Sequence, residues 1–138
     1  MPPLDEEEYR RWRDEAERAL TSARVQTDAA LFNWACFAAE QAAQLALKGL
    51  LHGLGRAPWG HDVLRLAALA REASLDVPEE VENRLRRLGR HYIPARYPDA
   101  HPSGPPSLHY GASDAEEAIA DAVEILGFVD RTWDGLHA

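Results

Sequence analysis

The segment from residue 84 to residue 96 carries a dense positive charge. It contains one histidine, His91, and no acid. Its five arginines are Arg84, Arg86, Arg87, Arg90 and Arg96. An arginine side chain offers a planar fork of donors that matches a phosphate, and the nearby Tyr92 and Tyr97 could stack on bases. One interpretation is therefore contact with a nucleotide or RNA. The other is a solvated helix face whose arginines pair with carboxylates elsewhere in the chain.

Two arginine-to-histidine pairs in this region have the spacing R-x4-H. They are Arg86 with His91 and Arg96 with His101. Such a pair suits phosphodiester cleavage without a metal, because a histidine can move a proton while an arginine stabilises charge developing on the phosphate. Arg86 and His91 would lie about 140° apart on a regular helix. They therefore converge only if the helix loosens before His91 or if a second subunit completes the site. Arg87 and His91 share a helix face, and that pairing could be merely structural.

A polar stripe runs along the otherwise apolar stretch from residue 29 to residue 53. Its members, which fall within an arc of about 120° on a helix, are Asn33, Glu40, Gln41, Gln44, Lys48 and His52. The stripe is either an exposed strip or the wall of a polar cleft. In the second case Glu40, Gln44 and Lys48 would line the cleft, and Glu40 would orient arginine or histidine side chains of the basic segment.

The sequence predicts neither a metal site nor a cofactor site. His91, His101, His109 and Asp99 do not have the spacing of a common zinc site. The glycine-rich signatures of the Rossmann fold and of the P-loop are both missing from the sequence, which excludes those two nucleotide sites. We therefore expect any catalysis to rest on side chains alone.

Apolar residues recur at helical spacing in the first half of the chain. A first helix is predicted over residues 5–25, and a long, mostly apolar and therefore central one over residues 29–53. Asp28 can act as the N-cap of the second helix. Asp62 can cap a third helix, which the segment at residues 74–78 ends.

The second half of the chain contains two more predicted helices and a long connection between them. A fourth helix begins near Glu79 and extends to about Tyr92. The stretch Pro94–Ala112 holds five prolines and two glycines, which excludes a helix or a central strand. Ser113 and Glu116 form a capping-box pattern for the last helix. The predicted fold is all-α, an up-and-down bundle of about five helices with a long proline-rich loop before the last one.

Composition points to one soluble domain over residues 1–138. The chain is 46% hydrophobic and 28% charged, and its net charge of −8 argues against a non-specific nucleic-acid coat. A single cysteine, Cys36, excludes an internal disulfide and fits a reducing cytoplasm. The charged N-terminus does not resemble a signal peptide, and the chain lacks an apolar run long enough to span a membrane. We therefore expect a cytoplasmic protein without a membrane partner.

Two segments resemble the HEPN family, the "higher eukaryotes and prokaryotes nucleotide-binding" domain. They are FAAEQAAQLALKGLLHGLGRAPWGHDVLRL at residues 37–66 and RHYIPARYPDAHPSGPPSLHYGASDAEEAIADAVEILGFV at residues 90–129. The resemblance implies a compact helical bundle that dimerises and is often paired with a minimal nucleotidyltransferase in a toxin–antitoxin system. In the nuclease branch, an R-x4-6-H motif cleaves RNA without a metal across the dimer cleft. This motif maps onto Arg86 and His91, which become the candidate catalytic residues.

The function implied is binding of a nucleotide or RNA phosphate, with ribonuclease activity as its catalytic form. The candidate binding residues are Arg87, Arg90, Tyr92, Arg96, Tyr97, Asp99, Glu40 and Lys48. The alternative is a non-catalytic interaction module that docks or neutralises its partner. Apolar faces such as that of the Trp133 helix further predict a homodimer or higher homo-oligomer.

Overall fold

The computed structural model describes residues 3–137, and within that range it contains helices and no strand. Its five α-helices are α1 (Glu6–Asp28), α2 (Phe32–Gly53), α3 (Val63–Glu72), α4 (Glu79–Gly89) and α5 (Ala112–Gly135). Two short 3-10 helices, η1 (Pro98–Ala100) and η2 (Pro106–His109), lie in the connection from α4 to α5. The predicted all-α bundle, with a long loop before its last helix, is confirmed.

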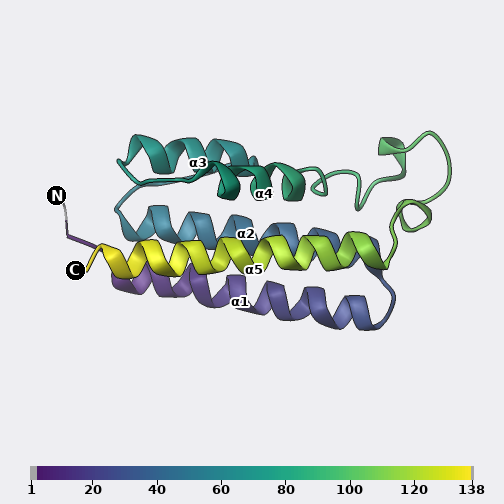
Figure 1. Ribbon diagram of the computed structural model, residues 1–138, viewed down its shortest axis with the longest axis horizontal. Coiled ribbons are helices and arrows are strands. Elements are labelled where there is room, and N and C mark those ends of the chain that lie inside the picture. The colour runs from purple at the N-terminus through teal and green to yellow at the C-terminus, as the bar shows by residue number, and fades with distance from the viewer. Residues whose placement is uncertain (1–2, 138) are drawn as a thin grey trace.

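Helix α2 lies at the centre of the bundle and packs against all four other α-helices. The long helices α1, α2 and α5 run side by side, while the shorter α3 and α4 lie across α2 from α1 (Figure 1). The proline-rich loop projects from the end of the bundle that lies away from the two chain ends (Figure 1). The loop and the end of α4 therefore share one end of the molecule.

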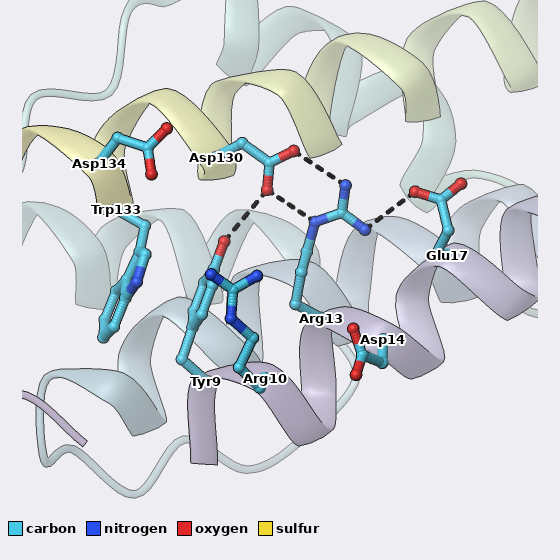
Figure 2. Close-up of a pocket in the computed structure, with 8 residues that line it drawn as sticks. All are labelled: Tyr9, Arg10, Arg13, Asp14, Glu17, Asp130, Trp133 and Asp134. Carbon is cyan, nitrogen blue, oxygen red and sulfur yellow. Dashed lines mark hydrogen bonds and ion pairs between the residues drawn. The ribbon is translucent and has the colours of Figure 1, made fainter. Parts of the chain in front are cut away.

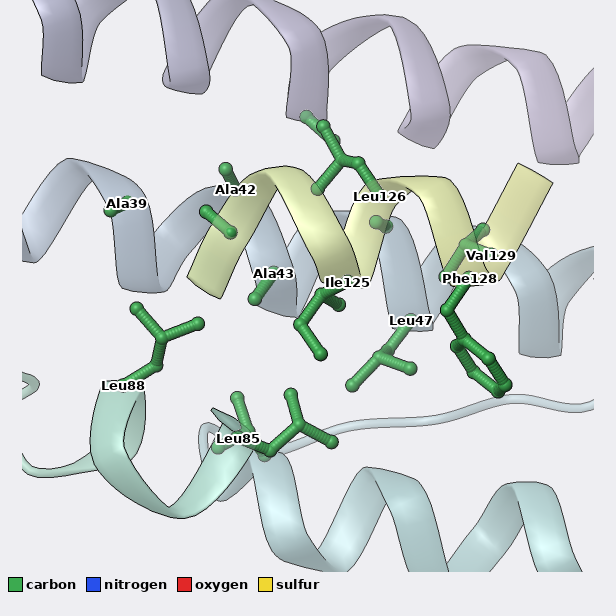
Figure 3. Close-up of a cluster of buried hydrophobic side chains, with 14 of the residues drawn as sticks. Ala39, Ala42, Ala43, Leu47, Leu85, Leu88, Ile125, Leu126, Phe128 and Val129 are labelled. Carbon is green, nitrogen blue, oxygen red and sulfur yellow. The ribbon is translucent and has the colours of Figure 1, made fainter. Parts of the chain in front are cut away.

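The core is built from many alanines and a few leucines on α2, together with larger side chains on the helices around it. Fully buried alanines of α2 face Ile125 and Val129 of α5 and Leu85 and Leu88 of α4 (Figure 3). Because alanine occupies little volume, the neighbouring backbones can approach α2 closely while their leucines and isoleucines fill the remaining space. This packing fixes the position of α4, on which the candidate site depends.

Two glycines at the end of α2 bring α1 and α5 especially close. A Cβ atom at Gly49 would lie 2.8 Å from the Cβ atom of Trp12 on α1. A Cβ atom at Gly53 would collide with the indole ring of Trp133 on α5, and it would lie 3.1 Å from the Cβ atom of Tyr9. Both positions therefore require a residue without a side chain.

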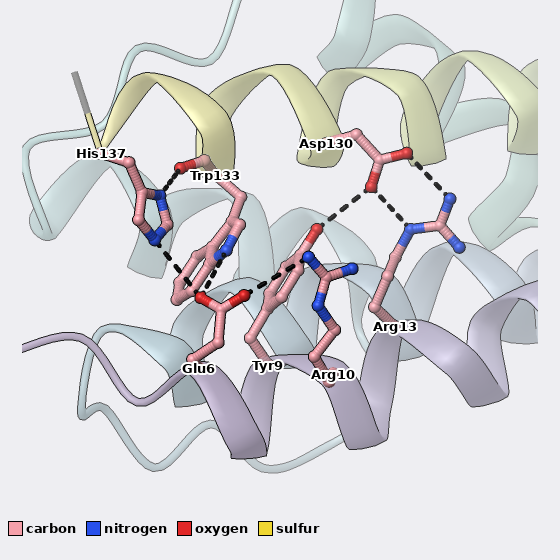
Figure 4. Close-up of polar contacts among 7 residues, drawn as sticks. All are labelled: Glu6, Tyr9, Arg10, Arg13, Asp130, Trp133 and His137. Carbon is pink, nitrogen blue, oxygen red and sulfur yellow. Dashed lines mark hydrogen bonds and ion pairs between the residues drawn. The ribbon is translucent and has the colours of Figure 1, made fainter.

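A polar cluster ties α1 to α5 beside these glycines. The Asp130 carboxylate accepts hydrogen bonds from the Tyr9 hydroxyl at 3.1 Å and from Arg13 at 2.8 and 2.9 Å (Figure 4). The buried ring of Tyr9 stacks on Trp133 with 4.0 Å between ring centroids. Together these contacts fix α5 against α1 near the two ends of the chain.

The helix starts agree with the sequence at Asp62 and differ at Asp28. The Asp62 carboxylate accepts hydrogen bonds from the backbone N–H groups of Leu64 and Arg65, as an N-cap should. Asp28, predicted to cap the second helix, is instead the last residue of α1. The chain turns at Ala30, whose φ of 60° is left-handed, so α2 begins only at Phe32.

The observed end of α4 and the observed start of α5 also differ from the prediction. Helix α4 ends at Gly89 rather than near Tyr92. Helix α5 begins at Ala112, so Ser113 lies inside its first turn and does not form the predicted capping box. The Asp114 carboxylate accepts the hydrogen bond from the N–H of Gly111 instead, at 2.8 Å.

The apolar surface that motivated self-association lies elsewhere than predicted. Trp133 is 1% exposed, because α1 and Tyr9 cover it, so the Trp133 face of α5 is not available to a partner. Large apolar side chains are exposed instead near the loop end of the molecule, at Trp34, Ile93, Tyr97 and Leu108. Among residues 3–137, none of the helices has the length and apolar character needed to cross a membrane.

The close packing at Gly53 generates a testable expectation. The substitution Gly53→Ala should lower the free energy of unfolding by about 1–3 kcal/mol, because the added methyl group overpacks against the buried Trp133 ring. Urea denaturation measures this change. Gly135→Ala is the matched control, since its Cβ would have no heavy atom within 4 Å. Equal stability of the two variants would contradict the packing described.

Candidate phosphate-binding site

Two of the five clustered arginines are bound to a buried carboxylate on α5. Asp121 is 1% exposed and accepts hydrogen bonds from Arg84 at 2.9 Å and from Arg87 at 2.6 and 3.0 Å. Arg84 also pairs with Glu80 at 3.1 Å. Hydrogen bonding to Asp121 raises the pKa of the Arg87 guanidinium further. For these two arginines the carboxylate-pairing interpretation holds, and Arg87 has a structural role in joining α4 to α5.

Arg86 and Arg90 lie on an exposed part of α4, away from Asp121. Arg86 donates a hydrogen bond to the neutral side chain of Asn83 at 2.6 Å. Arg90 is exposed at the C-terminal cap of the helix. Within residues 3–137 neither arginine forms an ion pair. Of the arginines in this segment that form no ion pair, these two are the exposed ones.

The helix loosens between Arg86 and His91, as convergence of the two would require. Beyond Gly89 the backbone N–H of His91 bonds to the carbonyl of Leu88, three residues back, at 3.0 Å. The His91 side chain nevertheless faces Tyr110, with Nδ1 lying 3.0 Å from the tyrosine oxygen. In the described residues Arg86 and His91 make no hydrogen bond to each other. Each of the two candidate catalytic side chains thus has a different hydrogen-bond partner, Asn83 for Arg86 and Tyr110 for His91.

His91 is half-buried in a setting that favours its uncharged form. Burial lowers the pKa of the imidazole, although the nearby carboxylates of Asp114 and Glu117 oppose this effect. Burial also raises the pKa of Tyr110 to about 12, so its hydroxyl keeps its proton at neutral pH. The contact with Tyr110 orients the ring. An uncharged, oriented imidazole is a group that can accept a proton.

Arg96 is enclosed by three aromatic rings. Its guanidinium carbon lies 4.4 Å from the ring centroid of Phe37, 4.5 Å from that of Tyr92 and 4.9 Å from that of Tyr97. Its Nε also donates a hydrogen bond to the carbonyl of Tyr92 at 2.8 Å. The structure thus brings together Arg96, Tyr92 and Tyr97. The guanidinium of Arg96 covers part of the ring surface that the two tyrosines could offer to a base.

Two histidines hold the proline-rich loop together. The rings of His101 and His109 stack in parallel with 4.3 Å between centroids, and their Nε2 atoms bond to the carbonyls of Pro94 and Ser103, both at 2.7 Å. Asp99 lies exposed in η1, within the same loop. Among the described residues, no group of three or more histidine, cysteine or acidic side chains is placed to hold a metal ion.

The polar stripe of α2 proves to be mainly buried. Glu40 is completely buried, and its two carboxylate oxygens accept hydrogen bonds from Gln44 at 2.7 Å and from Gln41 at 2.9 Å. Burial raises the pKa of Glu40 to about 7, against the opposing influence of the Arg96 and Lys48 charges. Lys48 is half-buried further along α2. Glu40 therefore lies inside the bundle, where the charge of Arg96 from the basic segment acts on it, and its side chain does not face solvent.

Sequence reasoning missed Asp121, although the pattern of α5 contains a signal for it. Asp121 lies three residues after the buried Ala118 and four before the buried Ile125, so it occupies the apolar face of that helix. An acid at such a position needs a buried partner. The partners are the arginines 34 and 37 residues earlier in the chain.

A hollow of about 450 Å³ also lies between α1 and α5, far from the loop (Figure 2). Its central charged groups are paired, because Asp130 binds Arg13 and Tyr9 while Arg13 also pairs with Glu17 at 3.1 Å. This arrangement indicates a structural connection between two helices. The end of α4 remains the better candidate for binding an anion.

Comparison with known proteins assigns the chain to a family. The model of the HEPN domain family matches residues 9–132, and the chain therefore belongs to the HEPN domain family. The chain matches no curated protein in the corresponding comparison. The resemblance found in the sequence is thus confirmed at the level of the family.

Solved structures support the same assignment. TT1696 from Thermus thermophilus is 44% identical, with a TM-score of 0.87, covering 90% of this chain and 97% of that one. ST0689, described as an archaeal HEPN homologue, is 32% identical with a TM-score of 0.75, covering 94% and 97%. The HEPN domain protein TM0613 from Thermotoga maritima is 27% identical with a TM-score of 0.73, covering 90% and 98%.

The burial of Glu40 generates a prediction about pH. Because its pKa is raised from 4.5 to about 7 on folding, the folded protein retains a proton that the unfolded chain releases between these values. The stability that this proton provides is present below pH 4.5 and is lost as the pH rises through about 7. Glu40→Gln should therefore exceed the wild type in free energy of unfolding by about 3 kcal/mol at pH 8.

Urea denaturation at two pH values checks this expectation. At pH 4.5, the ordinary pKa of this carboxyl, the advantage of Glu40→Gln should largely disappear. The control Glu116→Gln alters an exposed acid on α5 and should change stability by less than about 0.5 kcal/mol at both pH values. An advantage of Glu40→Gln that does not change with pH would show that Glu40 is ionised in the folded state.

Proposed function

We propose that the exposed end of α4 binds the phosphate of a nucleotide or of RNA, with Arg86 and Arg90 as the charged contacts. One observation carries this proposal. Asp121 neutralises Arg84 and Arg87, whereas Arg86 and Arg90 form no ion pair within residues 3–137. In a chain with a net charge of −8, two such exposed guanidinium groups form a local site for an anion. The exposed Tyr97 can add a stacking surface.

The catalytic form of this proposal is metal-independent cleavage of RNA. An uncharged His91, oriented by Tyr110, would accept a proton, while Arg86 would stabilise the charge on the phosphate. Since the two make no hydrogen bond within one protomer, we propose that a second copy of the chain completes the site. A homodimer follows from this requirement, and the exposed Trp34 and Tyr97 offer apolar surface for it.

The second candidate function is a non-catalytic interaction module. The observation that favours it is the 46% exposure of Ile93, a large apolar side chain three residues after Arg90. In either case we propose a minimal nucleotidyltransferase as partner in a toxin–antitoxin-type system, which rests on the family resemblance. The two functions differ in whether His91 does chemistry.

Phosphate binding is tested by removing the guanidinium group of Arg90. Arg90→Ala should weaken binding of a short single-stranded RNA and reduce the dependence of log K on log salt concentration by about one unit, because one phosphate contact is lost. Fluorescence anisotropy at several salt concentrations measures both quantities. Arg18→Ala, an exposed arginine on α1, is the control and should leave both unchanged. If log K depends equally on log salt concentration in the wild type and in Arg90→Ala, the proposed phosphate site is wrong.

Catalysis is tested by removing the proton acceptor. If the protein is a ribonuclease, His91→Ala should lower the cleavage rate by about 10²- to 10⁴-fold while RNA affinity stays near that of the wild type. Cleavage should continue in EDTA, since the mechanism uses no metal. His137→Ala, at the opposite end of the bundle, should cleave normally. Wild-type protein that cleaves no faster than His91→Ala would leave the interaction module as the function.

A further inference from the structure

A cavity of about 350 Å³ lies beside the end of α4, where the start of α3 approaches the chain that follows α4. Its walls include His61 and Val63 from the start of α3, and Tyr92, Ile93 and Pro94 from the segment after α4. The volume is at the lower end of the range for small-molecule sites, which suits one nucleoside-sized ligand.

The walls of this cavity provide flat and apolar surface. The rings of His61 and Tyr92 stack with 4.8 Å between centroids and an angle of 19° between their planes. Ile93 beside them is 46% exposed, although it is a large apolar side chain. A flat ligand that covers Ile93 and extends the ring stack would remove this apolar surface from water.

The cavity also contains a hydrogen-bond acceptor. Asp62 lies at its edge, and one carboxylate oxygen, Oδ1, caps α3 by accepting from the N–H groups of Leu64 and Arg65. The second oxygen accepts no hydrogen bond from the described residues. It can therefore accept one from the N–H groups that nucleobases present at their edges.

One wall of the cavity is close in sequence to the two exposed arginines. Gly89 lines it, Arg90 is the next residue, and Arg86 lies one turn earlier on the same helix. A Cβ atom at Gly89 would lie 3.2 Å from Cγ2 of Val63, so the glycine lets α3 come close to α4 at this point. The chain thus passes from two exposed arginines directly to residues that line an apolar, flat-walled cavity, an order that suits the phosphate and the base of one nucleotide.

We infer that this cavity binds the base of the nucleotide whose phosphate is held by Arg86 and Arg90. The inference rests on the proposed phosphate site and adds to it a base-binding surface formed by His61, Tyr92 and Ile93. The ligand is then a nucleotide or the exposed end of an RNA strand. Stacking supplies affinity for the base, and the guanidinium groups supply affinity for the phosphate.

Isothermal titration calorimetry with three probes separates the two contributions. The probes are AMP, ribose 5-phosphate, which lacks the base, and adenosine, which lacks the phosphate. AMP should bind about 10-fold or more tightly than ribose 5-phosphate, because base stacking on side chains contributes roughly a 5- to 150-fold gain in affinity. Ile93→Ala and His61→Ala should each reduce this ratio, while Leu108→Ala, an exposed apolar residue of the loop, should preserve it.

The outcomes distinguish the inference from the function on which it rests. Equal affinity for AMP and ribose 5-phosphate would overturn the base site and leave the phosphate site intact. Binding of adenosine as tight as that of AMP would support the cavity as a base site while removing the phosphate site. Absence of binding by all three probes would overturn both. If the Ile93→Ala variant binds AMP with the affinity of the wild type, the cavity is not the base site. The variant is informative because this exposed side chain can be shortened without disturbing the core.

Discussion

The close approach of neighbouring helices to α2 is the constraint on which the rest of the structure depends. The alanines along α2 and the glycines at positions 49 and 53 leave too little room for larger side chains there. The aromatic residues of the core therefore come from the other helices, with Trp133 and Tyr9 packed beside Gly53, while α2 contributes buried leucines as well as alanines. Along the polar stripe of α2, Glu40 is enclosed together with Asn33 and Gln44, whereas Gln41, Lys48 and His52 stay partly exposed.

The position of α4 follows from this packing and from one carboxylate. Leu85 and Leu88 direct one side of α4 towards the core, and Asp121 binds Arg84 and Arg87 on the side next to α5. A buried carboxylate without these partners would be costly, so the pairing constrains both helices. The side of α4 that faces solvent carries Arg86, and the exposed Arg90 follows as the C-terminal cap residue. The same interactions that stabilise the bundle thus decide which arginines are free to bind an anion.

The sequence predicted the fold more fully than the site, for physical reasons. Apolar residues at helical spacing identified most of the helices, helix stop and start signals placed the fourth, and the density of prolines identified the loop, because all these signals are local. The N-cap at Asp62 was also predictable from local chemistry. The prediction that Asp28 caps the second helix was wrong, because α1 continues to Asp28 and the chain turns only at Ala30, whose φ is left-handed. The resemblance to the HEPN family, carried by two segments, was confirmed for the chain as a whole.

The site required contacts between distant parts of the chain. No local pattern separates Arg87 from Arg86, because their difference lies in Asp121, 34 residues after Arg87. The enclosure of Arg96 depends in the same way on Phe37 of α2. The exposed apolar surface was misplaced onto the Trp133 helix because its cover, Tyr9, comes from the other end of the sequence.

The beginning of α1 and the end of α5 lie together, since Glu6 accepts a hydrogen bond from the Trp133 indole and pairs with His137. Helix α5 then runs 24 residues back to Ala112, beside the loop, a length of about 36 Å. An affinity tag, a fluorophore or a fused domain joined to either end of the chain is therefore held about that far from the start of α5. Both ends can be used for immobilisation in binding measurements without placing the attachment beside the proline-rich loop.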